Sequence, residues 1–325
     1  MTTLVTGGAG YIGAHTVRAL QNATRDVVVL DTLERGNKQA VMDAKLIIGD
    51  IADQRLVAKI CRKYKITSVV HFAAYKAVGE SMTHPMKYWQ NNVSSTLKLL
   101  ETLQSHDISR FVFSSSASVY GTPKSSPTTE NEPTNPESVY AETKLAVENI
   151  LRSLAIDGLN SISLRYFNAA GASSDNKIGE DWAASQNLIP RVMHALLDDK
   201  FKFEVFGNDY ATADGTCIRD YIHVEDLAVA HVKALEYLES YGKTTVCNIG
   251  TGKGTSVKQL LEMTAVVAKR EVPHTIGARR EGDPVSVYAD VTLANKVLGW
   301  HATQDLQSII QSAFTWHSTH PNGFR

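Results

Sequence analysis

A glycine-rich turn near the start of the chain restricts the possible folds more than any other feature of the sequence. It joins a short apolar run, Thr3–Thr6, to a segment of helical character, Tyr11–Asn22, and Arg55–Tyr64 is a second predicted helix. The further predicted strands are Val27–Leu30, Leu46–Ile48, Ser68–Phe72, Arg110–Phe113 and Asn160–Arg165. Short apolar strands separated by helices indicate βαβ units, so we predict an α/β fold with a buried, doubly wound parallel sheet.

The glycines of this turn, Gly7, Gly10 and Gly13, have the spacing of a dinucleotide-binding fingerprint. Glycine is needed where the backbone bends sharply or approaches a pyrophosphate too closely for a Cβ. The helix that begins at Tyr11 and Ile12 then offers free N–H groups to the phosphates. The strand–turn–helix context therefore predicts a Rossmann-like domain that binds a dinucleotide cofactor.

Acidic residues follow the next two strands. Asp31 ends the second strand and suits hydrogen bonds to the adenosine ribose hydroxyls, whereas its charge would repel the 2′-phosphate of NADP. Arg35 lies close enough in sequence to weaken that repulsion slightly, but NAD is the predicted cofactor. Asp50 and Ile51, after the third strand, are predicted to flank the adenine, and Asp50 is also suited to cap the helix that follows.

The regular alternation ends after about Gly171, where a polar stretch rich in small residues begins. We predict an NAD-binding domain at residues 1–170 and a smaller, mainly substrate-binding α/β region at residues 171–325 that interleaves with the first. The strands and helices expected in this second region are Phe203–Phe206, Val224–Leu238, Thr245–Ile249, Val257–Ala268 and Asp305–His317.

Composition excludes several classes of function. The net charge of -1 over 325 residues argues against a partner that is nucleic acid or an anionic membrane. No run approaches the roughly 18 apolar residues of a membrane helix, and the first residues lack the features of a signal peptide. The three cysteines and eleven histidines show no metal-ligand spacing. We expect a cytoplasmic protein without a bound metal.

A Tyr-x-x-x-Lys pair, Tyr140 and Lys144, provides the first catalytic candidates, because residues at i and i+4 share one face of a helix. An ammonium beside a phenol lowers the phenol pKa, so this pairing predicts a tyrosine that acts as a base near neutral pH. Ser114–Ser118 follows the strand Arg110–Phe113, at the sheet edge where doubly wound folds bind ligands. A hydroxyl there, such as that of Ser116, is suited to bond a substrate oxygen.

Eight stretches of the chain carry a family resemblance. They are GGAGYIGAH at 7–15, HFAAYKAVGES at 71–81, NNV at 91–93, FSSSASVYG at 113–121, YAETK at 140–144, RYFNAAGA at 165–172, FGNDYATADGTCIRDYIHVEDLA at 206–228 and RREGD at 279–283. Over nearly its whole length the chain thereby resembles the extended short-chain dehydrogenase/reductases and, among them, the UDP-glucose 4-epimerases. The resemblance implies reversible C4 epimerisation of UDP-glucose and UDP-galactose through a transient 4-keto sugar and NADH that stays bound.

The resemblance also implies roles for individual residues. Tyr140 would be the base, Lys144 would tune it and hold the nicotinamide ribose, and Ser116 would bond the 4-oxygen. The implied cofactor-binding residues are Gly7, Gly10, Tyr11, Ile12, Gly13, Asp31, Asp50, Ile51, Phe72, Ala73, Ala74, Lys76, Asn91, Ser114, Tyr140, Lys144, Tyr166 and Phe167. The implied substrate-binding residues are Lys76, Ser116, Tyr140, Asn168, Asn187, Leu188, Val205, Phe206, Arg219, Val287, Arg280 and Asp283.

Several alternatives stay open at this stage. Related nucleotide-sugar dehydratases usually carry acidic groups after the serine strand, and the Ser116–Ser118 segment has none, which argues against elimination of water. A dehydrogenase that releases NADH, an epimerase of UDP-xylose or UDP-glucuronate, and a non-catalytic NAD-binding regulator are not excluded. Cys217 and His223 are interpreted as structural residues.

Two further features concern substrate range and assembly. Val287 stands where some family members carry a tyrosine beside the sugar, so we hypothesise room for an N-acetyl group at C2 and turnover of UDP-N-acetylhexosamines. Two long helical stretches, from Met86 to Leu103 and from Val147 to Leu154, carry apolar stripes. The stripes suit packing within the subunit or a dimer interface, and the resemblance suggests a homodimer.

Overall fold

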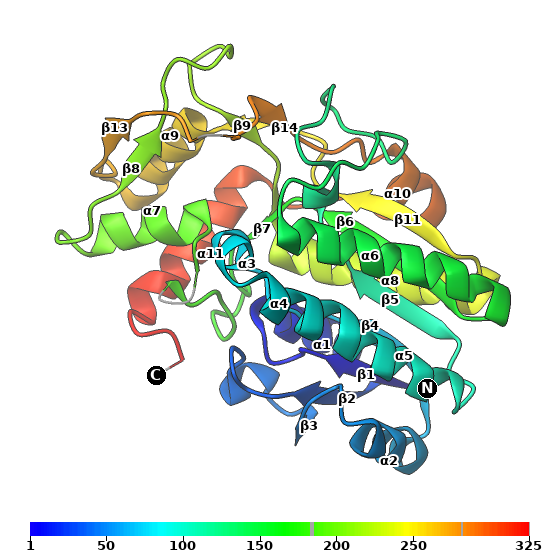
Figure 1. Cartoon of the computed structure of the whole chain (residues 1–325). Helices are drawn as coiled ribbons and strands as arrows, with labels where there is room; N and C mark the ends of the chain where they lie inside the picture. Colours follow the sequence, from blue (N-terminus) through cyan, green and yellow to red (C-terminus); the bar gives the residue numbers. More distant parts are fainter. Residues whose placement is uncertain (183–184, 281, 325) are drawn as a thin grey trace.

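A seven-stranded sheet forms the centre of the computed structural model, which describes residues 1–182, 185–280 and 282–324. The strand order is β11-β6-β5-β4-β1-β2-β3, and every neighbouring pair is parallel (Figure 1). The strands are β1 (Thr2–Thr6), β2 (Asp26–Asp31), β3 (Lys45–Ile48), β4 (Ile66–His71), β5 (Arg110–Ser114), β6 (Asn160–Tyr166) and β11 (Thr245–Ile249). The order reverses beside β1, so the ends of β1 and β4 flank the point where doubly wound sheets bind ligands. The predicted fold class is confirmed.

Helices cover both faces of this sheet. One layer contains α1 (Tyr11–Asn22), α8 (Val224–Tyr241) and α10 (Thr292–Leu298), which share a buried core with the strands. The other layer contains α2 (Gln54–Tyr64), α5 (Ser95–Gln104) and α6 (Val139–Leu154), which bury a separate core (Figure 1). Strands that are buried on both faces need apolar residues at consecutive positions. The short apolar runs in the sequence therefore predict the positions of these strands.

Side-chain caps set where several helices begin. Ser138 accepts a hydrogen bond from the backbone N–H of Ala141 at the start of α6, and Asp53 caps α2. Asp50, predicted as a possible cap for α2, instead accepts a bond from the N–H of Ala52 in the preceding turn. That interpretation of Asp50 is wrong by three positions, because the chain makes an extra turn between β3 and α2.

The first of the two long helical stretches is interrupted. It consists of α4 (Pro85–Tyr88), a π-helical turn at Trp89–Ser94 and then α5. A π turn shifts the side chains around the axis, so the apolar spacing does not keep one face. Met86 is accordingly 66% exposed, whereas Leu103 is buried, and the predicted continuous stripe is wrong at its beginning.

Small sheets and further helices form a second layer of structure beyond the carboxyl ends of the main strands (Figure 1). The small sheets pair β7 (Asn168–Ala170) with β10 (Tyr221–His223), β8 (Glu204–Phe206) with β13 (Thr275–Gly277), and β9 (Ile218–Arg219) with both β12 (Thr255–Ser256) and β14 (Ser286–Val287). The helices are α3 (Val78–Thr83) near the main sheet, and α7 (Leu188–Leu197), α9 (Val257–Ala268) and α11 (Leu306–Thr319), which enclose a third core. Among the described residues, no helix is long and apolar enough to cross a membrane.

Candidate active site

The glycine turn after β1 fits closely against the end of β4. Gly7 has a φ of +70°, and a Cβ on it would lie 2.6 Å from the backbone nitrogen of Ala73. A Cβ on Gly13 would lie 2.3 Å from the carbonyl oxygen of Gly7. Gly10, the N-cap of α1, leaves more room, since a Cβ there would meet only the Gly7 carbonyl, at 3.3 Å. The first turn of α1 can therefore present its N–H groups to a diphosphate without an obstructing side chain.

Asp31 is buried at the end of β2, where its carboxylate is already oriented. One oxygen accepts a hydrogen bond of 2.9 Å from the N–H of Ala9 and the other a bond of 2.8 Å from that of Leu33. Each carboxylate oxygen has a second lone pair, which suits the hydroxyls of a ribose. Arg35 forms long ion pairs of 3.9 Å with two glutamates and is largely exposed. The site thus fits a dinucleotide without a 2′-phosphate.

Two aromatic residues expected beside the cofactor share a contact that the sequence did not reveal. The rings of Phe72 and Tyr166 lie 4.7 and 6.4 Å from the ring of His231, a fully buried residue of α8. Phe167 is also buried, and Ile51 lies in the core shared by α2, α5 and α6. Ala74 follows Ala73 in the loop after β4.

The predicted catalytic residues converge at the carboxyl end of β5. Tyr140 and Lys144 lie on the first turns of α6, and the Nζ atom of Lys144 donates a 2.7 Å hydrogen bond to the carbonyl oxygen of Ser114. The Ser114 hydroxyl lies 2.8 Å from the hydroxyl of Tyr166. Ser116 lies close enough to the Tyr140 phenol to lower the pKa of that phenol.

Burial dominates the electrostatics of this pair. It raises the pKa of Tyr140 well above its ordinary value, and the Ser116 hydrogen bond offsets only part of that effect. Burial also lowers the pKa of Lys144 to about 7. The ammonium bonds the Ser114 carbonyl and lies 5.8 Å from the centre of the Tyr140 ring. In the protein without its cofactor, burial therefore sets the direction of the Tyr140 pKa. The prediction that Lys144 lowers this pKa, together with an oxidised nicotinamide, stays a prediction.

A buried ion pair contacts the serine segment through the hydroxyl of Ser115. Glu148 and Arg165 approach to 2.5 Å, and their side chains are 1% and 4% exposed. The Ser115 hydroxyl donates a 2.5 Å hydrogen bond to the same carboxylate. Glu148 lies one helical turn beyond Lys144, so the i, i+4 spacing that marked Tyr140 and Lys144 also contained a signal for it.

The predicted substrate residues gather around β9. Arg219 forms an ion pair with Asp283, and Val287 lies beside Arg219 in the register of β9 and β14. The guanidinium of Arg280 lies 4.1 Å from the centre of the Phe206 ring. One guanidinium paired with a carboxylate and another placed over an aromatic ring suit a nucleotide with phosphates.

Further contacts join this cluster to the serine segment. Val287 packs against a buried group that includes Ala117 and Phe167. Val205 is buried, and Leu188 is partly buried against the third core. Cys217 lies in that core, which agrees with the structural interpretation of the cysteine. Residue 281, within the RREGD stretch, lies outside the described residues.

Asparagines from three segments complete the set. Asn168 donates a 2.9 Å hydrogen bond to the carbonyl oxygen of Asp220. Asn91 bonds the neighbouring Asn92, which was not predicted and whose amide also bonds the backbone of Tyr75 and the hydroxyl of Thr143 on α6. Asn187 and Lys76 both donate hydrogen bonds to the carboxylate of Glu180, at 3.0 and 3.1 Å.

A dinucleotide cradle beside a buried tyrosine–lysine pair and a serine-lined strand end defines an α/β protein that carries out redox chemistry on a bound substrate. The chain belongs to the NAD dependent epimerase/dehydratase family, whose model matches residues 3–250. It is 46% identical to the UDP-glucose 4-epimerase of Lactobacillus helveticus, over 100% of this chain and 99% of that protein. The predicted resemblance to the UDP-glucose 4-epimerases is confirmed.

Solved structures agree with this assignment. The UDP-glucose-4-epimerase from Stenotrophomonas maltophila, with bound NAD and formylated UDP-arabinopyranose, has a TM-score of 0.96 and 38% identity, with 99% of each chain covered. The UDP-glucose 4-epimerase from Bifidobacterium longum, in complex with NAD+ and UDP, has a TM-score of 0.92 and 38% identity, with 100% of each chain covered.

Proposed function

We propose that this protein catalyses the reversible epimerisation of UDP-glucose and UDP-galactose at C4 of the sugar, with NAD as its cofactor. The observation that carries the proposal is the meeting of Tyr140, Ser116 and Lys144 beside the glycine cradle, in a chain that matches UDP-glucose 4-epimerases over its full length. A non-catalytic NAD-binding regulator would have no need of this buried constellation.

When bound, NAD supplies reversible oxidation at C4 and, in its oxidised form, a positive charge that lowers the pKa of a nearby phenol. Tyr140 takes the proton of the 4-hydroxyl on its phenol oxygen and later returns it. Ser116 bonds the 4-oxygen and holds the phenol in line. Lys144, fixed by the Ser114 carbonyl, adds positive charge behind the phenol. Inversion needs the sugar to turn over between the two half-reactions.

The nucleotide must therefore be held firmly while the sugar is held loosely. Arg219 and Arg280 supply guanidinium forks for the diphosphate, and Asp283 orients Arg219 through its ion pair. Aromatic and apolar contact comes from Phe206 and Val287. We infer that the small side chain of Val287 admits an N-acetyl group, so that UDP-N-acetylglucosamine and its galacto epimer are also substrates. Full-length similarity to UDP-glucose 4-epimerases favours hexoses over UDP-xylose and UDP-glucuronate.

We assign cofactor binding mainly to residues 1–170 and substrate binding mainly to residues 171–325, with α8, α10 and β11 returning to the main sheet. We further propose a homodimer through α5 and α6, where Leu97 is 39% exposed and Ile150 and Leu154 are only partly buried. We expect the enzyme to work in the cytoplasm.

The proposal is tested with purified protein and UDP-galactose, without added NAD, by following the anomeric signals in proton NMR. We expect the UDP-glucose signal to grow to a stable mixture, and Tyr140→Phe to slow this conversion at least about 1,000-fold while UDP still binds. Absence of conversion by the wild-type protein, with or without added NAD, would contradict the proposed reaction.

A further inference from the structure

Glu180 stands out among the buried charged residues, because one atom of it collects three donors. Its Oε1 atom accepts hydrogen bonds of 3.1 Å from Lys76, 2.8 Å from Ser185 and 3.0 Å from Asn187. The residue is only 5% exposed, and its backbone carbonyl accepts a 3.0 Å bond from the indole of Trp316. A carboxylate that is fixed in this way can hold its donors in place.

The donors come from opposite sides of the active site. Lys76 lies in the loop after β4 and is expected to contact both cofactor and substrate, whereas Asn187 is the N-cap of α7 and is expected to bind the nucleotide. Glu180 also acts on Tyr11 at the start of α1, whose pKa is raised by burial and by the charge of this carboxylate. One side chain therefore faces the cofactor cradle and the substrate region together.

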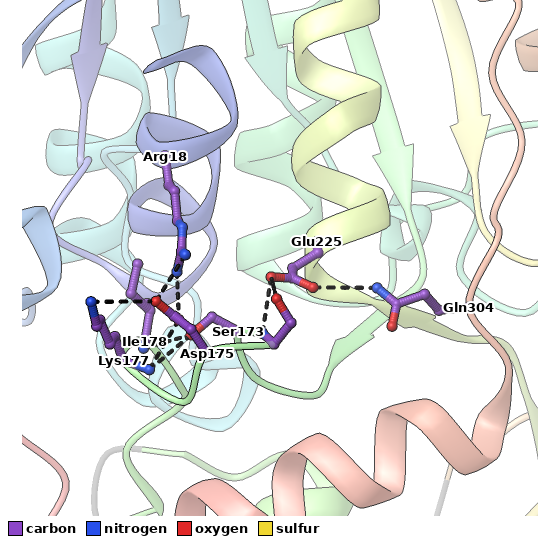
Figure 2. Close-up of polar contacts among 8 residues, drawn as sticks. Arg18, Ser173, Asp175, Lys177, Ile178, Glu225 and Gln304 are labelled. Atoms are coloured by element: carbon purple, nitrogen blue, oxygen red, sulfur yellow. Dashed lines mark hydrogen bonds and ion pairs between the residues drawn. The ribbon is translucent and has the colours of Figure 1, made fainter. Parts of the chain in front are cut away.

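The segment that ends at Glu180, residues 172–180, is bonded to the rest of the fold at several points. Figure 2 shows Arg18 reaching from α1 to Asp175, with which it makes two hydrogen bonds of 2.6 and 2.9 Å. It also shows Glu225, at the start of α8, in contact with this segment and with Gln304. The Tyr11 hydroxyl donates a hydrogen bond to the carbonyl oxygen of Gly171, which precedes the segment. The segment that leads to Glu180 is thus anchored to α1 and α8.

We propose that Glu180 is a positioning residue for epimerisation, which aligns Lys76 and Asn187 on the nucleotide sugar and couples the substrate region to the cofactor cradle. The inference rests on the proposed function. The Lys76 side chain is 56% exposed, so without a partner it would sample many rotamers. Fixing such a donor in advance strengthens the alignment of the substrate, because ordering cost is met before binding.

The negative charge of Glu180 makes the direction of the change in UDP affinity a test of the proposal. A carboxylate near a diphosphate repels it, so removal of the charge by itself would tighten the binding of UDP. Loss of alignment has the opposite effect, since Lys76 and Asn187 would no longer be held toward the ligand. The direction of the change in UDP affinity therefore separates positioning from simple repulsion.

The test compares the wild-type holoenzyme with Glu180→Gln, Lys76→Met and the double variant. We expect Glu180→Gln to weaken UDP binding about 5-fold by calorimetry and to lower kcat/KM for UDP-galactose about 30-fold. In the Lys76→Met background, Glu180→Gln should lower UDP affinity and kcat/KM by clearly smaller factors, because the partner that Glu180 positions is gone. Glu180→Asp, which keeps the charge but is one methylene shorter, should also be impaired.

Glu225→Gln is the matched control, because it makes the same chemical change on the 172–180 network without contacting Lys76 or Asn187. Its kcat/KM should stay within about 3-fold of the wild-type value. Equal losses in Glu180→Gln and Glu225→Gln, tighter UDP binding by Glu180→Gln, or additive effects in the double variant would each overturn the inference. Should Glu180→Gln not fold, Glu180→Asp decides: wild-type kinetics in that variant would also overturn it. If wild-type protein neither binds UDP nor turns over UDP-galactose, the proposed function itself falls.

Discussion

The cofactor cradle and the substrate cluster use different parts of the chain to bind their ligands. At the cradle, Gly7 and Gly13 bring backbone against backbone, with no space for even a Cβ. Around β9, side chains do the binding, as in the ion pair of Arg219 with Asp283, and the strands β9 and β14 there are only two residues long. A change in the cradle should therefore damage the fold, whereas a change around β9 should damage ligand binding alone.

The largest expected effect is that of Gly13→Ala in the cradle. The new Cβ would lie 2.3 Å from the Gly7 carbonyl oxygen, so either α1 or the turn must move. We expect the free energy of unfolding to fall by more than about 3 kcal/mol, measured by urea denaturation, and bound NAD to be lost. Gly79→Ala, where a Cβ meets nothing within 4 Å, is the control and should change stability by less than about 1 kcal/mol.

Arg219→Met should show the opposite pattern. We expect UDP affinity to fall about 100-fold, since a charge-assisted fork to phosphate is lost, while stability changes by less than about 1 kcal/mol. Arg25→Met removes a comparable ion pair, with Glu239 at 2.6 Å, which joins the turn before β2 to the last turns of α8, and it should leave UDP affinity unchanged. A similar loss of UDP affinity in both variants, measured by calorimetry, would contradict the claim that side chains around β9 bind the ligand specifically.

The stability of the cofactor-free protein should depend on pH through Lys144, which lies at the catalytic site between the two regions. Burial lowers the folded-state pKa of Lys144 to about 7, whereas in the unfolded chain the group titrates near pH 10.4. Between these values the unfolded chain binds a proton that the native protein does not, so stability rises with pH. From pH 7 to pH 9 the gain should be about 2 kcal/mol in cofactor-free protein.

Lys144→Met should lack this rise, and urea denaturation at the two pH values measures the difference. Lys98→Met, an exposed position on α5, is the control and should keep the wild-type pH dependence. A parallel pH profile in Lys144→Met and wild type would show that burial does not control this lysine.

Val287→Tyr carries the smallest expected effect and concerns only the substrate cluster. Because Val287 packs beside Ala117 and Phe167, a ring there would narrow the space next to the sugar. We expect kcat/KM for UDP-N-acetylglucosamine to fall about 10-fold more than that for UDP-glucose. Val266→Tyr, exposed on α9, should affect both substrates equally. No turnover of UDP-N-acetylglucosamine by wild type would remove the hypothesis of a broad range.

The sequence predicted the cradle well because its determinants are local. The turn, the helix Tyr11–Asn22 and Asp31 lie within thirty-one residues, and their spacing expresses the geometry directly. The predicted ranges Thr245–Ile249 and Val257–Ala268 also agree with β11 and α9, since each is a short apolar or amphipathic run with clear ends.

What the sequence did not show depends on distant partners. Glu180 and Glu148 are charged residues whose burial follows only from what the fold packs around them. The desolvation of Tyr140 could not be predicted for the same reason, since spacing along a helix does not reveal how deeply a side chain is buried. The π turn at Trp89–Ser94 likewise depends on contacts that Asn92 makes with Tyr75 and α6.

The central claim is that C4 is inverted with no net oxidation, by a cofactor that stays in its cradle. The direct measurement is to incubate the enzyme with UDP-galactose deuterated at C4 and to analyse the UDP-glucose formed by NMR. We predict that the product keeps its deuterium at C4. Product with protium at C4, or an oxidised sugar that accumulates as the substrate disappears, would contradict the account.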